Sequence, residues 1–424
     1  MYPMTSRERL IATLNHQPTD RLCVDFGAGF QTGMGAGAVH RLRAAVLGDQ
    51  SGHRVKVIES YQMLGEIDEK LRQALGLDVV GVHGAGTMFG FKNEGWKPFT
   101  LFDGTPVLVP GEFNVTRAPD GGWFIYPEGD IRVPPSAWMP KDAYFFDATS
   151  RQAPLDETKL DPAENCEEMG VISPEDVQHF ARVAQHYHET TDYGIYMTLP
   201  GTAFGDIALV PAPWMKHPKG IRSVEDWYMA TVTHRDYVQK VFEVQCECAL
   251  KSIELLAAAV GDRAQVVFVS GTDFGTQTGQ FCSVKTYREL YKPFHLAVNQ
   301  LIHRLTKWKT FIHSCGAVAP FIPEFIEAGF DVLNPVQCSA TGMEPRALKR
   351  EFGRHLVFWG GGVDTQRTLP FGTPDQVYRE VRERIDILGE GGGFVFNSTH
   401  NVQSNVPVPN LLALFRAIKD SARS

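Results

Sequence analysis

The chain lacks a surplus of basic residues, which argues against proteins that bind nucleic acid over a broad surface. Lys and Arg together number 41 against 49 for Asp and Glu, so the formal net charge is −8. Binding to phosphates needs a basic excess to neutralise them, and this composition has none. The chain also lacks any apolar run that approaches the ~18 residues of a membrane span. We therefore expect neither nucleic acid nor a membrane as a partner.

Cysteine is scarce and its number is odd. The seven cysteines are scattered along the chain, whereas a secreted disulfide framework uses an even set at regular spacing. Free thiols and metal ligation are the better expectations. Residues 1–14 have the pattern of a polar amphipathic helix and lack the apolar core of a signal peptide. We therefore expect a cytoplasmic protein.

Two glycine-rich stretches lack the spacing of nucleotide-binding loops. Residues 27–37 do not contain Gly-x-Gly-x-x-Gly, and no clear helix start follows them, so we expect a flexible loop and no dinucleotide site. The triplet Gly360-Gly361-Gly362 is not followed by the Lys-Ser/Thr pair of a phosphate-binding loop. Its glycines nevertheless allow close backbone approach to a ligand.

Short apolar runs alternate with helical patterns along most of the chain. We predict eight strands, at residues 20–26, 77–82, 194–198, 265–270, 310–313, 332–334, 356–359 and 394–397. Helical periodicity separates most of them, and we also expect a helix over residues 57–75. This alternation is typical of an α/β fold, the (β/α)8 TIM barrel. The 424 residues fit one such barrel with a β-rich insertion.

The insertion is expected at residues 89–147. Apolar and polar residues alternate there between turn sequences such as Asp103-Gly104, which is typical of β-hairpins. Residues 1–88 and 148–424 would then form the barrel. The insertion is open to three interpretations, namely a lid, a contact in a homodimer, or a dock for a partner protein.

The sharpest chemical pattern lies at the end of the fifth predicted strand. Active sites of this fold lie at the C-terminal ends of the strands. His313 and Cys315 are two apart on an extended chain, so imidazole and thiolate can converge on one ion. Zinc favours such ligands in tetrahedral geometry. His400, at the end of the eighth strand, is the third candidate ligand. The fourth is Gln337 or Cys338, or an open position that holds water or substrate.

Other polar residues at strand ends are candidates for substrate and proton-transfer roles. Asp25 follows the first strand and Asp273 the fourth, and either can orient a substrate or move a proton. His83 follows the second strand, and Gly361 and Asp364 follow the seventh; we take these three as substrate-binding candidates. Structural roles compete with the assignments of the three aspartates: a loop cap or a partner for Arg21 in the case of Asp25, a turn residue for Asp273 and a cap for Asp364.

These residues and their context resemble the uroporphyrinogen decarboxylase superfamily, in its zinc-dependent methyltransferase-like branch. The matching stretches are residues 5–9 with 18–21 (the N-terminal helix and first strand), 311–316 (the His-x-Cys-Gly zinc motif), 329–334 (the following strand) and 358–364 (a glycine-containing strand end). The resemblance covers residues 1–85 and most of 190–420. It leaves the β-rich insertion out.

The resemblance implies a (β/α)8 barrel and a zinc ion held by His-x-Cys and a later cysteine. In the methyltransferase members and in cobalamin-independent methionine synthase, this zinc activates a substrate thiol. In several members the methyl group travels through a corrinoid carried by a partner protein. His313 and Cys315 match the first two ligands. His400 stands where a cysteine is usual, and Gln337 stands where methionine synthase has a ligating carboxylate.

These two departures leave the zinc more positive, which makes it a stronger Lewis acid and a poorer setting for thiolate attack. The leading hypothesis is a zinc-dependent methyltransferase-like enzyme that acts on a small methylated or methoxylated substrate, with a corrinoid or a thiol as methyl acceptor. The alternative is a zinc-dependent lyase or decarboxylase of retro-aldol type that acts on a small oxygenated substrate.

A third interpretation is a non-catalytic corrinoid-binding module. The chain contains no Asp-x-His-x-x-Gly motif of a corrinoid carrier, which counts against it. The resemblance also raises the question of porphyrinogen decarboxylation itself. We do not expect that reaction, because the Arg-rich N-terminal motif that binds the acidic tetrapyrrole is not evident.

Overall fold

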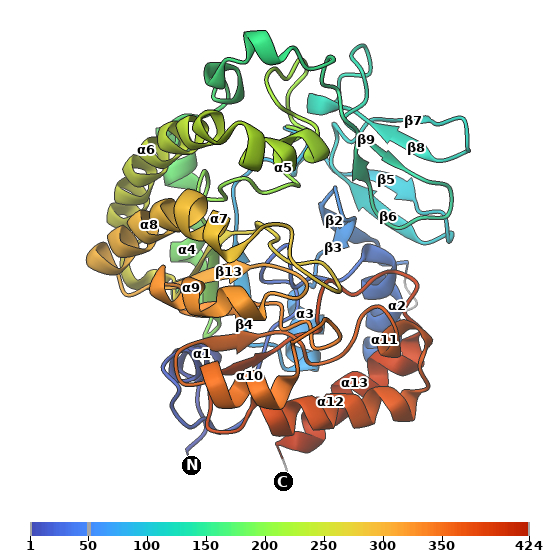
Figure 1. Ribbon diagram of the computed structural model, residues 1–424. Helices are drawn as coiled ribbons and strands as arrows, with labels where there is room; N and C mark the ends of the chain where they lie inside the picture. Colours follow the sequence, from blue (N-terminus) through green and yellow to red (C-terminus); the bar gives the residue numbers. More distant parts are fainter. Residues whose placement is uncertain (1, 49–51, 423–424) are drawn as a thin grey trace.

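Eight parallel strands form a nearly closed barrel in the computed structural model, which describes residues 2–48 and 52–422 (Figure 1). In chain order they are β1 (Cys23–Val24), β4 (Val79–Val82), β11 (Gly194–Thr198), β12 (Val266–Ser270), β13 (Lys309–His313), β14 (Val332–Asn334), β15 (Val357–Trp359) and β16 (Phe394–Phe396). They pair in the order β1-β16-β15-β14-β13-β12-β11-β4. At the remaining seam, the backbone N–H of Asp78 donates to the carbonyl of Val24 at 2.8 Å. The predicted strands and the TIM-barrel class are confirmed.

Helices cover the outside of the barrel. They are α4 (Pro174–Thr190), α5 (Val224–Thr233), α6 (Arg235–Val260), α7 (Val284–Thr286), α8 (Lys292–Leu305), α9 (Ile322–Glu327), α10 (Pro345–Phe352), α11 (Thr368–Phe371), α12 (Pro374–Leu388) and α13 (Val408–Ser421). In Figure 1, α6 and α8 lie on one side of the barrel and α12 and α13 on another. Over the described residues, no helix combines the length and apolar character that crossing a bilayer requires.

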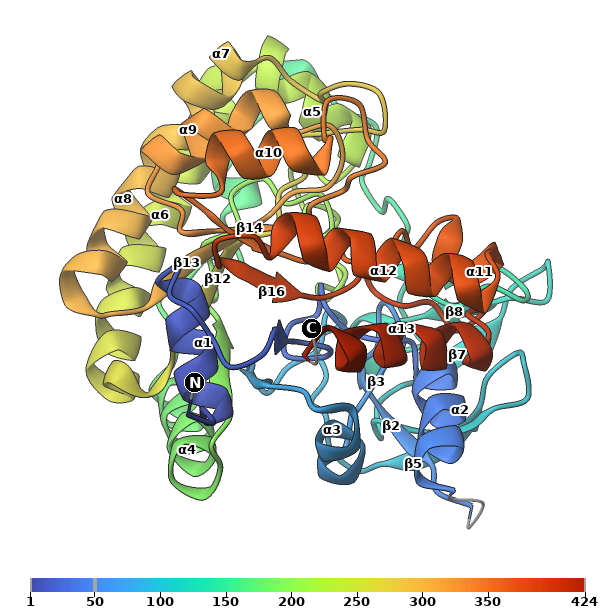
Figure 2. The ribbon, with the colours of Figure 1, turned by 90° about the horizontal axis from the view of Figure 1, so that it is seen from below.

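Helix α1 (Ser6–Leu14) covers the N-terminal ends of the strands, as Figure 2 shows from below. Thr5 begins it with a capping box, because its side chain accepts from the backbone of Glu8 while the Glu8 carboxylate accepts from the N–H of Thr5. Leu10 is fully buried and belongs to the cluster that fills the barrel interior. A Cβ at Gly194 would lie 2.3 Å from Leu10, so a larger residue there would push the helix away.

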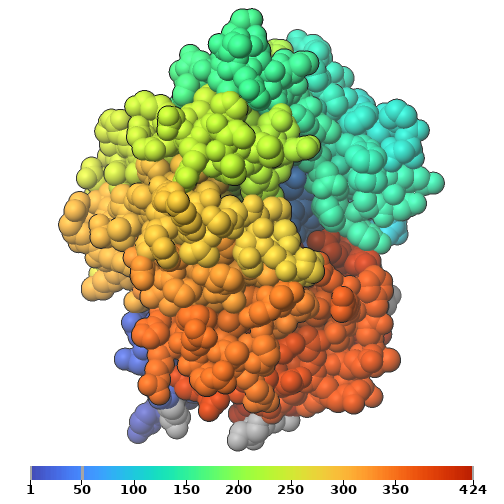
Figure 3. Space-filling model, in the orientation of Figure 1, coloured from blue at the N-terminus to red at the C-terminus, as the bar shows by residue number. Residues whose placement is uncertain are grey.

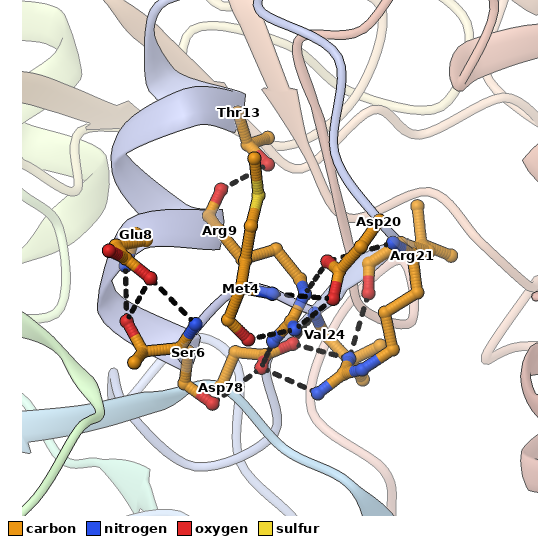
Figure 4. A network of polar contacts seen from close by, with 11 residues as sticks. Met4, Ser6, Glu8, Arg9, Thr13, Asp20, Arg21, Val24 and Asp78 are labelled. Carbon is orange, nitrogen blue, oxygen red and sulfur yellow. Dashed lines mark hydrogen bonds and ion pairs between the residues drawn. The ribbon is translucent and has the colours of Figure 1, made fainter. Parts of the chain in front are cut away.

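A buried ion network ties this helix to the barrel seam (Figure 4). Asp78 is fully buried and accepts from Arg9 at 2.6 Å and from Arg21 at 2.7 Å. It also accepts the backbone N–H of Val24 at 3.0 Å, while Arg9 contacts Asp20 at 2.7 Å. The network therefore joins α1, β1 and the residue that precedes β4. Buried charges need such paired, hydrogen-bonded surroundings.

Two four-stranded sheets lie beside the barrel, in the orders β3-β2-β6-β5 and β10-β9-β8-β7 (Figure 1, mostly cyan to teal). Their strands are β2 (Val55–Glu59), β3 (Leu64–Gly65), β5 (Lys97–Thr100), β6 (Pro106–Val109), β7 (Val115–Arg117), β8 (Trp123–Ile125), β9 (Ala137–Met139) and β10 (Asp147–Ala148). The hairpins expected over residues 89–147 are therefore present. The first sheet also includes β2 and β3, which precede that range.

The helix expected over residues 57–75 is wrong for most of its length. Strands β2 and β3 occupy its first part, and only α3 (Glu69–Leu75) is helical. Along β2 the residues alternate between buried and half-buried, which is the period of a strand with one face against the core. The apolar residues that suggested a helical stripe belong to that strand and to the turn after it.

The glycine-rich stretch of residues 27–37 is a loop at its start, but helix α2 (Ala36–Leu47) begins within it. The residue before this helix is Gly35, which makes no side-chain capping bond. Sequence signals for a helix start depend on a capping side chain such as Ser, Thr, Asp or Asn. None stands there, so no local pattern indicated the helix start.

Candidate metal centre

His313 and Cys315 lie at the C-terminal end of β13, as predicted. The Sγ atom of Cys315 is 3.3 Å from Nε2 of His313. The backbone N–H of Cys315 donates to Asp273 at 2.7 Å, and the N–H of Gly316 donates to Oε1 of Gln337 at 2.8 Å. The next residue must be glycine, because Gly316 has φ +87° and a Cβ there would lie 2.5 Å from neighbouring backbone. The local backbone thus holds the thiol beside the imidazole.

His400 completes the group from the loop after β16. Its ring centroid is 5.5 Å from that of His313, and the two planes meet at 70°. One ligand atom from each of His313, Cys315 and His400 can be chosen so that all three lie within 4.8 Å of one another. Within the described part of the chain, no other set of three His, Cys, Asp or Glu residues comes this close. The structure therefore brings together the three ligands predicted from strand-end positions.

Asn334 fixes which nitrogen of His313 is available. Its Nδ2 group donates to the carbonyl of Trp359 at 2.8 Å, so its Oδ1 faces the imidazole. Oδ1 lies 2.5 Å from Nδ1 of His313 and accepts the proton there. The lone pair of Nε2 is then left on the side of Cys315. Metal-ligating histidines are commonly oriented by such an outer hydrogen bond.

The protonation states of the group suit a metal site. Burial lowers the pKa of His313 to about 4 and that of His400 to about 4, so both imidazoles are neutral at pH 7 and can donate a lone pair. Burial, followed by the negative charge of Asp273, raises the pKa of the Cys315 thiol. A buried thiol of this kind gives up its proton when a cation replaces it.

One contact within the group has a length that fits zinc ligation. Zn–N bonds of about 2.05 Å and Zn–S bonds of about 2.3 Å place tetrahedral ligand atoms roughly 3.3–3.7 Å apart. The contact of 3.3 Å between Sγ of Cys315 and Nε2 of His313 has this length. Of the two residues considered for the fourth position, Cys338 lies outside the close group. Gln337 stays a candidate, although its Oε1 already accepts from Gly316.

A cavity of about 380 Å³ opens beside two of the three candidate ligands, Cys315 and His400. One part of its wall is formed by Cys315, His400 and Gln337. Tyr61, between β2 and β3, and Asp147, in β10, come from the two sheets beside the barrel, which we call the β-rich region. In Figure 3 a hollow is visible where the teal β-rich segment, the yellow-to-orange segment and the red C-terminal segment meet. The volume suits a small ligand. An open fourth coordination position would face this cavity.

Asp273 and Asp364 lie close to the centre. Asp273 is bonded to the Cys315 backbone, and burial raises its pKa. Asp364 lines the cavity, and its Oδ1 accepts the backbone N–H groups of Gln366 and Arg367. Asp364 therefore combines the predicted capping role with exposure to the cavity. Neither role excludes contact with a substrate.

Asp25, His83 and Gly361 lie in the barrel mouth but do not line this cavity. Asp25 is fully buried, and its carboxylate accepts from the indole N–H of Trp359 at 3.0 Å; burial raises its pKa to about 6. Nδ1 of His83 lies 2.9 Å from the hydroxyl of Thr198. A Cβ at Gly361 would lie 2.4 Å from a backbone carbonyl. These contacts favour structural roles, and their predicted catalytic or binding roles stay untested.

Three residues of the site were not among the candidates predicted from the sequence. Asn334 orients His313, and its position opposite His313 on the neighbouring strand was the available signal. Asp206 interacts electrostatically with Cys315 and Asp273, and burial raises its pKa to about 7. Tyr61 borders the cavity. It was not considered as a site residue because residues 57–75 were wrongly predicted to be helical. No local pattern pointed to Asp206.

The fold and the site define a TIM-barrel protein with a candidate His/Cys metal centre at the barrel mouth. The family model for Uroporphyrinogen decarboxylase (URO-D) matches residues 204–421, which is just over half of the chain and includes the three predicted ligands. The chain belongs to the uroporphyrinogen decarboxylase family. The resemblance inferred from its motifs is thereby confirmed.

Two methyltransferases are similar to the chain. A methylated-thiol–coenzyme M methyltransferase of Methanosarcina mazei is 28% identical over 170 residues, which are 39% of this chain and 40% of that protein. The match thus spans less than half of this relative. A solved structure described as a methyltransferase from Methanosarcina mazei aligns over 98% of this chain and 99% of that one, with a TM-score of 0.55 and 15% identity. At this identity the likeness shows a shared fold.

Proposed function

We propose that the protein is a zinc-dependent methyltransferase-like enzyme that acts on a small methylated or methoxylated substrate, with a corrinoid or a thiol as methyl acceptor. One observation carries the proposal: His313, Cys315 and His400 converge, and Cys315 and His400 line a cavity, in a chain of this family. Zinc, when bound, supplies a Lewis acid that activates a coordinated thiol, water or carbonyl oxygen. The remaining steps depend on the protein's own residues.

The surrounding residues hold the ligands in place for this role. Asn334 presents Nε2 of His313, and Asp273 fixes the backbone of Cys315. In the proposal Asp273 also orients the substrate or moves a proton beside the site, and its hydrogen bond to the backbone of Cys315 holds it there. Asp25 supports the mouth through its bond to Trp359. Asp364 contacts the substrate from the cavity wall.

The partner assignments follow from the same proposal. A corrinoid protein is the proposed partner wherever the methyl group does not pass directly to a thiol. The β-rich region borders the cavity through Tyr61 and Asp147, so it is placed to act as a lid or as the dock for that partner. Assembly as a homodimer and a cytoplasmic location stay predictions from the sequence.

A lyase or decarboxylase of retro-aldol type is the second candidate. It is favoured by the ligand set, in which Cys315 is the single anionic member and His400 and Gln337 are neutral. Product analysis separates the two functions. A lyase releases a carbonyl fragment or CO₂ without any methyl acceptor, whereas a methyltransferase releases no product until an acceptor is present.

Metal analysis combined with a methyl-acceptor screen tests the leading proposal. We expect about one zinc per chain in the purified protein, as for a three-ligand catalytic site. His313→Ala and Cys315→Ala should lose both zinc and activity. His186→Ala, on the exposed face of α4, is the matched control and should retain both. Wild-type protein without stoichiometric zinc, together with full activity of His313→Ala, would refute the proposal.

A tightly bound corrinoid would bear on the third interpretation. If the purified protein carried a corrinoid and turned over no methylated substrate, it would be a corrinoid-binding module and not an enzyme. Absorption spectroscopy of the purified protein detects a bound corrinoid directly. Turnover with an added acceptor would exclude this interpretation.

A further inference from the structure

The cavity beside the metal centre is lined by carboxylates and neutral polar groups. Its two carboxylates belong to Asp147 and Asp364. Its amide side chains are those of Gln62, Gln277, Gln337, Gln366, Asn401 and Gln403. Within residues 2–48 and 52–422, no lysine or arginine lines it. A sulfonate, phosphate or carboxylate in this cavity would therefore meet like charge and no positive side chain.

Neither carboxylate is neutralised by the protein. Among the described residues, neither Asp147 nor Asp364 forms an ion pair with a Lys, Arg or His side chain. The Oδ1 atom of Asp364 is occupied by two backbone N–H groups, and its Oδ2 atom makes no bond among the same residues. Asp147 is exposed on β10, and its partial burial raises its pKa. Both charges are thus available to a ligand.

Aromatic side chains stand next to Asp147. Tyr61 and Phe145 line the cavity with it. Two hydrogen bonds from backbone N–H groups fix this arrangement. The N–H of Phe146 donates to the carbonyl of Tyr61 at 2.8 Å, and the N–H of Ala148 donates to the Tyr61 hydroxyl at 3.2 Å. A carboxylate beside aromatic rings is a typical environment for an ammonium group, because the ring faces attract cations as well.

Another part of the cavity wall has the reverse preference. Cys315 and His400 line it, and a divalent ion held by one thiolate and two neutral imidazoles would keep a net positive charge. Such an ion would attract a lone pair or an anionic heteroatom. The carboxylates and the candidate ligands in one cavity together suit a ligand whose donor atom and cationic group are separated by a short linker.

We propose that the cavity selects a small ligand with an ammonium group, free or methylated, at the end opposite its metal-binding heteroatom, and that it disfavours anionic ligands. The inference rests on the proposed function. It separates this chain from its relative, whose name specifies coenzyme M, a thiol that carries a sulfonate. A neutral polyhydroxylated ligand bound by the amides is the rival, and the test distinguishes it.

Three thiols of similar size and different charge test this selectivity. They are 2-aminoethanethiol, 2-mercaptoethanol and 2-mercaptoethanesulfonate, and each is titrated into the cobalt(II)-substituted full chain. Thiolate binding to cobalt gives a charge-transfer absorption, so affinity is measured without turnover. We expect the amine to bind about 5- to 30-fold more tightly than the alcohol, and the sulfonate to bind most weakly, with differences that shrink at high salt.

Charge-removing variants connect the preference to the two carboxylates. Asp147→Asn and Asp364→Asn should each reduce the ratio of amine to alcohol affinity about 3- to 5-fold, and the double variant should remove the preference. Asparagine keeps the Oδ1 acceptor that the turn after Asp364 needs. Asp386→Asn, on the exposed surface of α12, removes the same charge outside the cavity and should leave the ratio unchanged.

A second measurement is independent of the metal. In metal-free protein, tetramethylammonium should raise the Tm more than sodium at equal ionic strength, and methanesulfonate should not exceed chloride. The double Asp147→Asn, Asp364→Asn variant should lose the difference. If no thiol binds the cobalt form but this cation effect is present, the proposed function fails while the charge selectivity stands.

Two results would overturn the inference itself. One is a sulfonate thiol that binds as tightly as the amine. The other is an order of affinities that the double variant leaves unchanged, which would assign recognition to the neutral amides. Either result leaves the zinc proposal intact if all three thiols give the charge-transfer band.

Discussion

Replacing Asn334 by alanine should weaken zinc binding although Asn334 is not a ligand. The change removes the acceptor 2.5 Å from Nδ1 of His313 and leaves a buried N–H group without a partner. An unsatisfied buried donor costs about 1–3 kcal/mol. The imidazole can also rotate or change tautomer, so that Nε2 no longer faces Cys315. Loss of an outer hydrogen bond of this kind typically lowers metal affinity about 10- to 100-fold.

The assay is competition for zinc with a chromophoric chelator, combined with urea unfolding of the metal-free protein. Asn299→Ala is the matched control, because Asn299 is also fully buried and donates to the carbonyl of Ala328 at 2.8 Å, far from the site in the fold. Both variants should lose stability, but only Asn334→Ala should lose zinc affinity. A zinc Kd for Asn334→Ala within about twofold of wild type would refute the reasoning about the tautomer.

Two further predictions concern the seam network. Asp78→Ala removes the fully buried carboxylate that Arg9 and Arg21 share and that accepts the N–H of Val24, so two guanidinium groups are left with Asp20 alone. We expect the free energy of unfolding in urea to fall by about 3–5 kcal/mol, whereas Asp262→Ala at an exposed ion pair should lower it by under about 1 kcal/mol. Burial alone would raise the pKa of Asp20, but hydrogen bonds from Arg9 and from the backbone outweigh it and lower this pKa to about 2. Since the folded-state pKa is depressed, this stabilisation is complete above about pH 4 and is lost as the pH falls towards 2. Unfolding free energies of wild type and Asp20→Asn should therefore converge in that window, and parallel curves would contradict the assignment.

The barrel strands were predictable because of their two-sided burial. A parallel strand covered by helices outside and side chains inside is apolar at nearly every position, as in β12, where all five residues are buried. Such runs stand out between amphipathic helices. The convergence of the candidate ligands was predictable for a related reason, since the C-terminal ends of all barrel strands meet at one mouth. His400 was thereby assigned from its strand although it lies 85 residues beyond Cys315.

The walls of the cavity were not predictable in the same way. Tyr61 and Asp147 reach it from strands outside the barrel, and their placement depends on how the β-rich region packs. Helix α2 begins without a capping side chain, so no local sequence pattern predicted where it starts. Local pattern therefore reveals the barrel and its ligands, while the groups that select a substrate depend on tertiary packing.

The pairing of β16 has a consequence for how the metal centre forms. This strand lies between β15 and β1, so it joins the last part of the barrel to the first. His400 lies in the loop after it, so the three candidate ligands come together only when β16 is docked beside β15. Binding of an ion by this group would therefore be thermodynamically linked to the docking of β16. An ion at a free concentration of 100 times its Kd would stabilise the docked strand by about 2.7 kcal/mol, and its release would report undocking of β16.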